Sequence, residues 1–273
     1  MFIHAVVFGL ATMLFSHFWF PVSVEETLWW HLMCCGTYFN MMLLSETSPT
    51  TNDEKKQKYL SSLFLLSTSI RSLFPRIDVE RICYFDTFIS TTIVGRTLAT
   101  VGEVAFSLQI SLAMLRLMKE LNVRSFVPYV ITPAITVAQV LCWCGVLTTN
   151  QLFHCFEESI WTIFMFLLIP LTFRLMRKTE CNEVYYKLMG CMTLLTIYVI
   201  YMTFIDVPMY YRRYIQNEKH NVNYLSLKEG IADSISCKMV TQSYSVWKED
   251  SVWMIGYFTF CSLISIGLIQ SKN

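Results

Sequence analysis

Long apolar segments separated by short polar ones make up most of this chain. A helix needs about 20 predominantly apolar residues to cross a bilayer. Segments of roughly that length or more occupy 2–24, 27–44, 85–118, 127–147, 152–173, 188–211 and 252–269. Only helices or closed barrels satisfy the backbone inside lipid. The pattern therefore predicts an all-α fold, a polytopic bundle of transmembrane helices.

The segment 59–74 is the ambiguous part of this pattern. It is short, rich in serine and interrupted by Arg71, and Pro75 follows it. Such a segment either crosses the membrane or lies in its interface as an amphipathic helix. The bundle has eight spans in the first case and seven in the second.

Lysine and arginine in the short loops predict the orientation. The loops 45–58, 116–124 and 174–187 contain basic residues, whereas 25–26 and 148–151 contain none. Basic short loops face the cytosol. With eight spans every basic loop falls on that side, and both termini are cytosolic. Seven spans would put the N-terminus outside, so the charge distribution favours eight. The polar stretch 212–250 then forms an extracytoplasmic loop, and 45–58 forms a cytosolic one.

Composition supports a membrane location. Hydrophobic residues account for 54% of the chain and charged residues for 15%, against roughly 25% charged in soluble domains. A net charge of +1 gives no general attraction to nucleic acid. We therefore expect residues 1–273 to form one domain embedded among lipids, in the plasma membrane or an endomembrane. The sequence specifies no cofactor and no oligomeric state.

Two opposite charges lie deep inside the segment 85–118. Arg96 and Glu103 fall on one helical face with other polar residues, namely Thr92, Thr100, Ser107 and Ser111. An arginine facing lipid would cost at least about 2.5–3.5 kcal/mol. This polar face must therefore contact protein or water. Gly95, Ala99 and Gly102 lie beside it and predict close approach of another helix.

Further charges lie near the outer ends of two other segments. His154, Glu158 and Trp161 share one helical face, with Glu157 turned by about 100°. We expected Glu158 to be the local partner of His154. Asp206 precedes Pro208 at a similar depth. Together with Arg96 and Glu103 they predict a charged cavity open to the non-cytosolic side, provided that the helices are neighbours. Alternatively, such charges only hold helices together.

The cavity hypothesis assigns a role to each residue. Catalytic acid or base chemistry falls to Glu103, Glu158 and Asp206. Substrate binding falls to Arg96, Glu157, Thr100 and Trp161. The preferred hypothesis is an enzyme for a lipid or another amphiphilic or anionic ligand, because the charges gather toward one leaflet. A proton-coupled transporter and a receptor or structural subunit are the alternatives. No HExxH, GxSxG, Walker A or CxxC motif is present.

The cysteines and tryptophans complete the predictions. Most of the ten cysteines lie in apolar segments, and Cys142-x-Cys144 has no histidine at zinc-ligand spacing, so no metal site is predicted. Cys83 and Cys237 fall in loops on the same outer side, which predicts a disulfide there. A last group was interpreted as an interfacial aromatic belt: Trp29, Trp30, Trp247 and Trp253.

Overall fold

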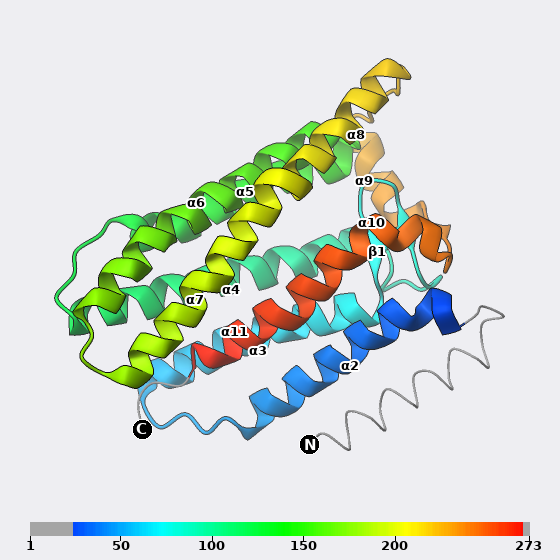
Figure 1. Ribbon diagram of the computed structural model, residues 1–273. Helices are drawn as coiled ribbons and strands as arrows, with labels where there is room; N and C mark the ends of the chain where they lie inside the picture. The colour runs from blue at the N-terminus through cyan, green and yellow to red at the C-terminus, as the bar shows by residue number, and fades with distance from the viewer. Residues whose placement is uncertain (1–23, 270–273) are drawn as a thin grey trace. The chain divides into compact units, whose positions relative to one another are not determined.

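The computed structural model describes residues 24–269, and most of that range is helical (Figure 1). The helices are α2 (Val24–Glu46), α3 (Asn52–Leu73), α4 (Thr92–Glu120), α5 (Val127–Thr148), α6 (Gln151–Lys178), α7 (Asn182–Tyr201), η1 (Met202–Asp206), α8 (Val207–Lys219), α9 (Leu227–Ser236), α10 (Tyr244–Ile255), η2 (Gly256–Cys261) and α11 (Ser262–Gly267). The all-α prediction is confirmed. The predicted span 2–24 lies outside the described residues.

Within residues 24–269, five helices are long and apolar enough to cross a membrane. They are Thr92–Glu120, Val127–Thr148, Gln151–Lys178, Asn182–Lys219 and Tyr244–Gly267. The fourth joins α7, η1 and α8, and the fifth joins α10, η2 and α11. Helices of this length and composition indicate an integral membrane protein. The total of eight spans stays a prediction.

Helix α3 begins inside the segment predicted to be the loop 45–58. The hydroxyl of Thr51 accepts a hydrogen bond from Glu54 N, and the Glu54 carboxylate accepts one from Thr51 N, both at 3.2 Å. This capping box satisfies amide groups that the first helical turn leaves without partners. The polar residues 52–58 are therefore helical. The predicted loop 212–250 is likewise partly helical, because it contains the end of α8, all of α9 and the start of α10.

The described chain divides into two compact units. The first contains residues up to Gln109 and the segment from Ser234 onward, and the second contains Ile110–Asp233. In the first unit, α2 and α3 pack side by side and the helix α10–η2–α11 packs against both (Figure 1). In the second, α6 packs against α5, α7 and α8.

A small sheet joins two loops of the first unit. Strand β1 (Arg76–Ile77) pairs antiparallel with β2 (Ile82–Cys83), and β2 pairs in parallel with β3 (Met239–Val240). The strands come from the segments before α4 and before α10. The sequence placed both segments on the same side of the membrane, and their pairing agrees with that prediction.

Aromatic side chains form the core beneath this sheet. Trp29, Trp30 and Trp247 are 5%, 3% and 0% exposed, and all three rings contact Tyr84. Two of the three indole N–H groups bond to the protein backbone: Trp30 Nε1 donates to Ser72 O at 3.1 Å, and Trp247 Nε1 to Thr241 O at 2.9 Å. The belt interpretation was therefore wrong for these three tryptophans, which bury their rings in protein.

Candidate functional site

The polar face of α4 forms the centre of a buried ion-pair network. Arg96 Nη2 donates to Glu103 Oε1 at 3.0 Å, two helical turns further along α4. Arg71 of α3 brings its Nη1 to 3.8 Å from the same carboxylate oxygen. Arg71, Arg96 and Glu103 are each at most 8% exposed. The polar face was predicted to contact protein or water, and here it contacts protein.

The loop between α3 and α4 contributes a second carboxylate. Asp78 accepts a hydrogen bond from Arg76 and lies 4.0 Å from Arg96 Nη1. Arg76 also donates to Ser90 O at 2.6 Å and to the Thr92 hydroxyl at the start of α4. We call Arg71, Arg76, Asp78, Arg96 and Glu103 the arginine cluster. It contains three positive and two negative groups.

The electrostatics of Asp78 follow from this arrangement. Burial by itself would raise the pKa of its carboxyl. The guanidinium groups of Arg76, Arg96 and Arg71, together with the hydrogen bond from Arg76, outweigh burial and hold that pKa below its ordinary value. Asp78 is therefore ionised at neutral pH and acts as a counter-ion.

The guanidinium of Arg71 lies against two aromatic rings. Its Cζ lies 5.1 Å from the ring centre of Phe258 and 5.9 Å from that of Tyr257. Aromatic faces attract a cation but accept no strong hydrogen bond. Within the described part of the chain, its buried Nη1 has no hydrogen-bond partner. This atom is therefore a buried donor that lies 3.8 Å from Glu103 Oε1.

Small residues make this packing feasible. A Cβ at Gly95 would lie 2.3 Å from Arg76 Cδ, and one at Gly102 would lie 2.7 Å from Ser67 Cβ. Ala99, between them, is fully buried. The predicted close-packing edge is confirmed, and it faces α3 and the Arg76 side chain.

Below the cluster, neutral polar residues link the helices of the first unit. Gln109 Nε2 donates to Ser265 O at 2.8 Å, and the Ser265 hydroxyl donates to Gln109 Oε1 at 2.6 Å and lies 2.9 Å from Ser61 Oγ. Gln57 Nε2 donates to Gln109 O at 3.2 Å. Such bonds hold apolar helices together inside lipid.

A second buried cluster lies in the second unit, at the turn between α5 and α6. His154 Nδ1 is 2.8 Å from Glu157 Oε2 and 3.7 Å from Cys142 Sγ. The three residues are 6%, 2% and 0% exposed, respectively. The expected pairing of His154 with Glu158 was wrong, because Glu157 at i+3 makes this contact. We call these three residues the histidine cluster.

The remaining predicted residues divide between the two units. Glu158 is half-buried, and Trp161 is buried on α6. Asp206 is buried in the π-helical turn η1, which contacts α6. Four residues later, the ring of Tyr210 stacks on His154 with centroids 5.3 Å apart. Arg96, Glu103 and the half-buried Thr100 belong to the first unit. The single shared cavity therefore stays a prediction.

The structure forms no disulfide between Cys83 and Cys237. Cys83 is opposite Val240 in the β2–β3 ladder, which puts Cys237 three residues out of register. At about 3.3 Å per residue this offset is roughly 10 Å, beyond the Cα separation of about 7 Å that a disulfide tolerates. Burial also raises the pKa of the Cys83 thiol, which disfavours the reactive thiolate.

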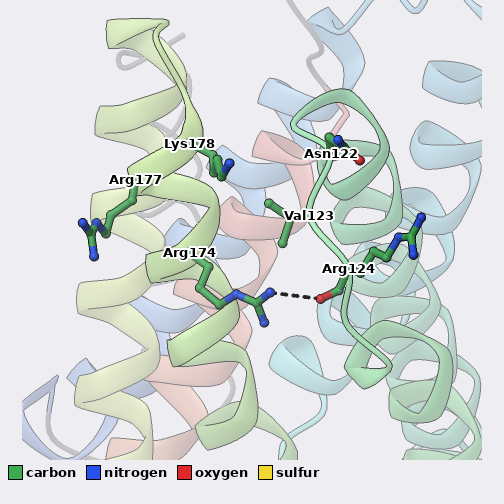
Figure 2. A pocket seen from close by; sticks show the side chains of 6 residues that line it. All are labelled: Asn122, Val123, Arg124, Arg174, Arg177 and Lys178. Carbon is green, nitrogen blue, oxygen red and sulfur yellow. Dashed lines mark hydrogen bonds between the residues drawn. The ribbon is translucent and has the colours of Figure 1, made fainter.

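Basic residues surround a pocket of about 610 Å³ in the second unit (Figure 2). It lies between the α4–α5 loop and the last turns of α6, and it is lined by Asn122, Val123, Arg124, Arg174, Arg177 and Lys178. Arg174 reaches across and donates to Arg124 O at 3.2 Å. In Figure 2 the side chains of Arg124 and Arg177 point away from that bond. The pocket contains basic residues from two loops predicted to be cytosolic.

Sequence reasoning missed part of both clusters. Arg71 was noted only as an interruption of an apolar segment, and Arg76 and Asp78 were not singled out. The Arg-x-Asp pair just after Pro75 was the available signal. Cys142 and His154 are 12 residues apart across a turn, so their spacing resembled no metal motif.

These observations define an all-α integral membrane protein with two buried polar clusters. No protein-family model matches the chain, and no similar curated protein or solved structure was found. The function therefore has to be argued from the clusters themselves.

Proposed function

We propose that this chain is a multi-pass membrane protein that binds the anionic headgroup of an amphiphile at the arginine cluster. We further propose eight spans with cytosolic termini, so that the cluster and its sheet lie toward the non-cytosolic side. The observation that supports ligand binding is Arg71. It is buried, it belongs to a cluster with one more positive than negative group, and its Nη1 forms no hydrogen bond within the described chain.

A single carboxylate or phosphate oxygen would complete this arrangement. It would neutralise the extra positive charge and accept a hydrogen bond from Arg71 Nη1. Charge-assisted bonds to an arginine contribute about 1.5–3 kcal/mol. Arg71 and Glu103 each keep an exposed edge of 8%, which gives a headgroup a point of entry. The alkyl chain of such a ligand would lie among the apolar helices.

Glu103 fits the role of counter-ion better than that of catalytic acid. Two guanidinium groups flank its carboxylate, and one donates a hydrogen bond at 3.0 Å. Its Oε1 is thus already paired with both Arg96 and Arg71. This favours a binding or transport function over proton transfer by Glu103. The catalytic roles of Glu158 and Asp206 stay predictions.

Ligand-induced stabilisation of the purified protein tests the proposal. Thermal unfolding in neutral detergent would be followed with oleate or phosphatidate and with the uncharged analogue monoolein. We expect the anionic amphiphiles to raise the unfolding temperature and monoolein to leave it unchanged. In Arg71→Gln the apparent affinity should fall about 10-fold or more, because one charge-assisted bond is lost.

Arg177→Gln is the matched control. Arg177 also lies over an aromatic ring, that of Phe173 at 5.9 Å, but it is exposed in the basic pocket. Equal loss in both variants would show general attraction of anions to positive charge and refute the proposal. If Arg71→Gln does not fold, Arg71→Lys retains the charge but not the planar fork. Unchanged affinity in Arg71→Lys would equally refute the role assigned to the guanidinium.

A further inference from the structure

We propose that Cys142, His154 and Glu157 bind one divalent transition-metal ion, for which zinc is the best fit. The proposal concerns the second unit alone and does not depend on ligand binding at the arginine cluster. It rests on the chemistry of the donors, their convergence and their burial.

The donor set is the first argument. A thiolate, an imidazole nitrogen and a carboxylate oxygen are the three side-chain ligands that zinc uses in proteins. Magnesium and calcium prefer sites made only of oxygen, so Cys142 and His154 select against them. Three protein ligands leave a fourth position for water or substrate, which is the arrangement of catalytic zinc sites.

The geometry is the second argument. One donor atom from each residue lies within 4.8 Å of the other two. Zinc bonds of about 2.0–2.3 Å in a tetrahedron place ligand atoms roughly 3.2–3.6 Å apart. The observed separations of 2.8 Å from His154 Nδ1 to Glu157 Oε2 and 3.7 Å to Cys142 Sγ fall on either side of that range. Shifts of these side chains that bring the three ligand atoms to that spacing would admit the ion.

The surroundings of His154 are the third argument. The side chain is more than nine-tenths buried. Packing fixes the ring: Tyr210 stacks on it, and a Cβ at Gly145 would lie only 3.1 Å from its Cδ2. Packing thus holds Nδ1 of the imidazole beside Glu157 and Cys142 before any ion binds.

Proton balance makes a further prediction. An ion on Nδ1 requires that any hydrogen of the neutral imidazole be carried on Nε2. The Cys142 thiol must release its proton to become a thiolate ligand. Zinc binding should therefore release a proton from Cys142.

Metal analysis of the untagged full-length protein tests the site. Protein purified in detergent without chelator would be dialysed against zinc sulfate, and its bound zinc would be measured by elemental mass spectrometry. We expect one equivalent per chain, which Cys142→Ser and Glu157→Gln should lose. The same preparation loaded with cobalt chloride should show a thiolate-to-cobalt charge-transfer band that disappears in Cys142→Ser.

Neighbouring residues of the same type provide the controls. Cys144→Ser changes the other cysteine of the same helix, and Glu158→Gln changes the adjacent carboxylate. Both variants should keep the zinc and the cobalt band. No bound zinc in folded wild type, or a band that survives Cys142→Ser, would overturn the proposal. If Cys142→Ser fails to fold, protection of Cys142 from alkylation by added zinc decides the question in wild type, and equal labelling with and without zinc refutes the site.

Discussion

The two buried clusters differ in how completely their polar groups are paired. In the arginine cluster, five charged groups from α3, α4 and the loop between them contact one another, and Asp78 and Glu103 each contact two arginines. In the histidine cluster, Cys142 Sγ and Glu157 Oε2 both lie close to one imidazole nitrogen, His154 Nδ1. The first arrangement ties separate elements together, whereas the second occupies one helical hairpin.

The two clusters should differ in how much they contribute to the stability of the protein. Removing one member of a buried ion pair leaves an uncompensated charge in protein, which costs far more than a lost neutral contact. The arginine cluster should therefore dominate the stability of the first unit even where it also binds a ligand. The histidine cluster should matter little for stability in the absence of metal. Three substitutions test this difference, beginning with the largest expected effect.

Glu103→Gln should destabilise the protein by about 3–5 kcal/mol, because Arg71 and Arg96 lose the carboxylate they share. The free energy of unfolding would be measured by denaturant titration in detergent. Glu158→Gln, a half-buried carboxylate on α6, is the matched control and should change it by no more than about 0.5 kcal/mol. Equal effects of the two substitutions would show that the charge of Glu103 has no special role in stability.

Asp78→Asn should cost about 1.5–3 kcal/mol at neutral pH, since the charge-assisted hydrogen bond from Arg76 and the ion pair with Arg96 are lost. The arginines lower the pKa of Asp78 in the folded state despite its burial. Its ionised form therefore stabilises the fold above the unfolded value of about 3.9, and this contribution is lost as pH falls through the folded pKa.

Thermal unfolding at pH 7 and at about pH 3 checks this sign. The difference in unfolding temperature between wild type and Asp78→Asn should be large at pH 7. It should become smaller at the lower pH, as Asp78 becomes protonated. A difference that is independent of pH would show that the charge of Asp78 does not contribute to stability.

Glu157→Gln should have the smallest effect, at most about 1.5 kcal/mol without metal, because the amide oxygen of glutamine can still accept from His154 Nδ1. Added zinc should then widen the difference, since only wild type gains stability from the ion. Unfolding temperatures with and without zinc sulfate give the measurement. A large loss of stability in metal-free Glu157→Gln would show that the histidine cluster, like the arginine cluster, stabilises the fold.

Sequence patterns predicted the helices and the buried face of α4, because the cost of an arginine in lipid dictates where Arg96 points. They could not predict that Arg71 and Asp78 contact this face, because the periodicity of one helix does not show which other segments pack against it. His154 illustrates a finer limit. Both i+3 and i+4 residues lie near it on a helix, and the rotamers that select Glu157 depend on packing with α5 and Tyr210.

The pairing of β2 with β3 has a consequence for how the protein is made. Next to these strands, Gln242 donates a hydrogen bond to the backbone oxygen of Tyr84, 158 residues earlier in the chain. The first unit is therefore complete only after its last helix has been made. The second unit is continuous and has no such requirement. During translation, the charged residues of α3 and α4 are therefore made before the segment that completes their unit. A chain truncated before α10 would keep the whole second unit but would lack Tyr257 and Phe258, whose rings lie next to Arg71.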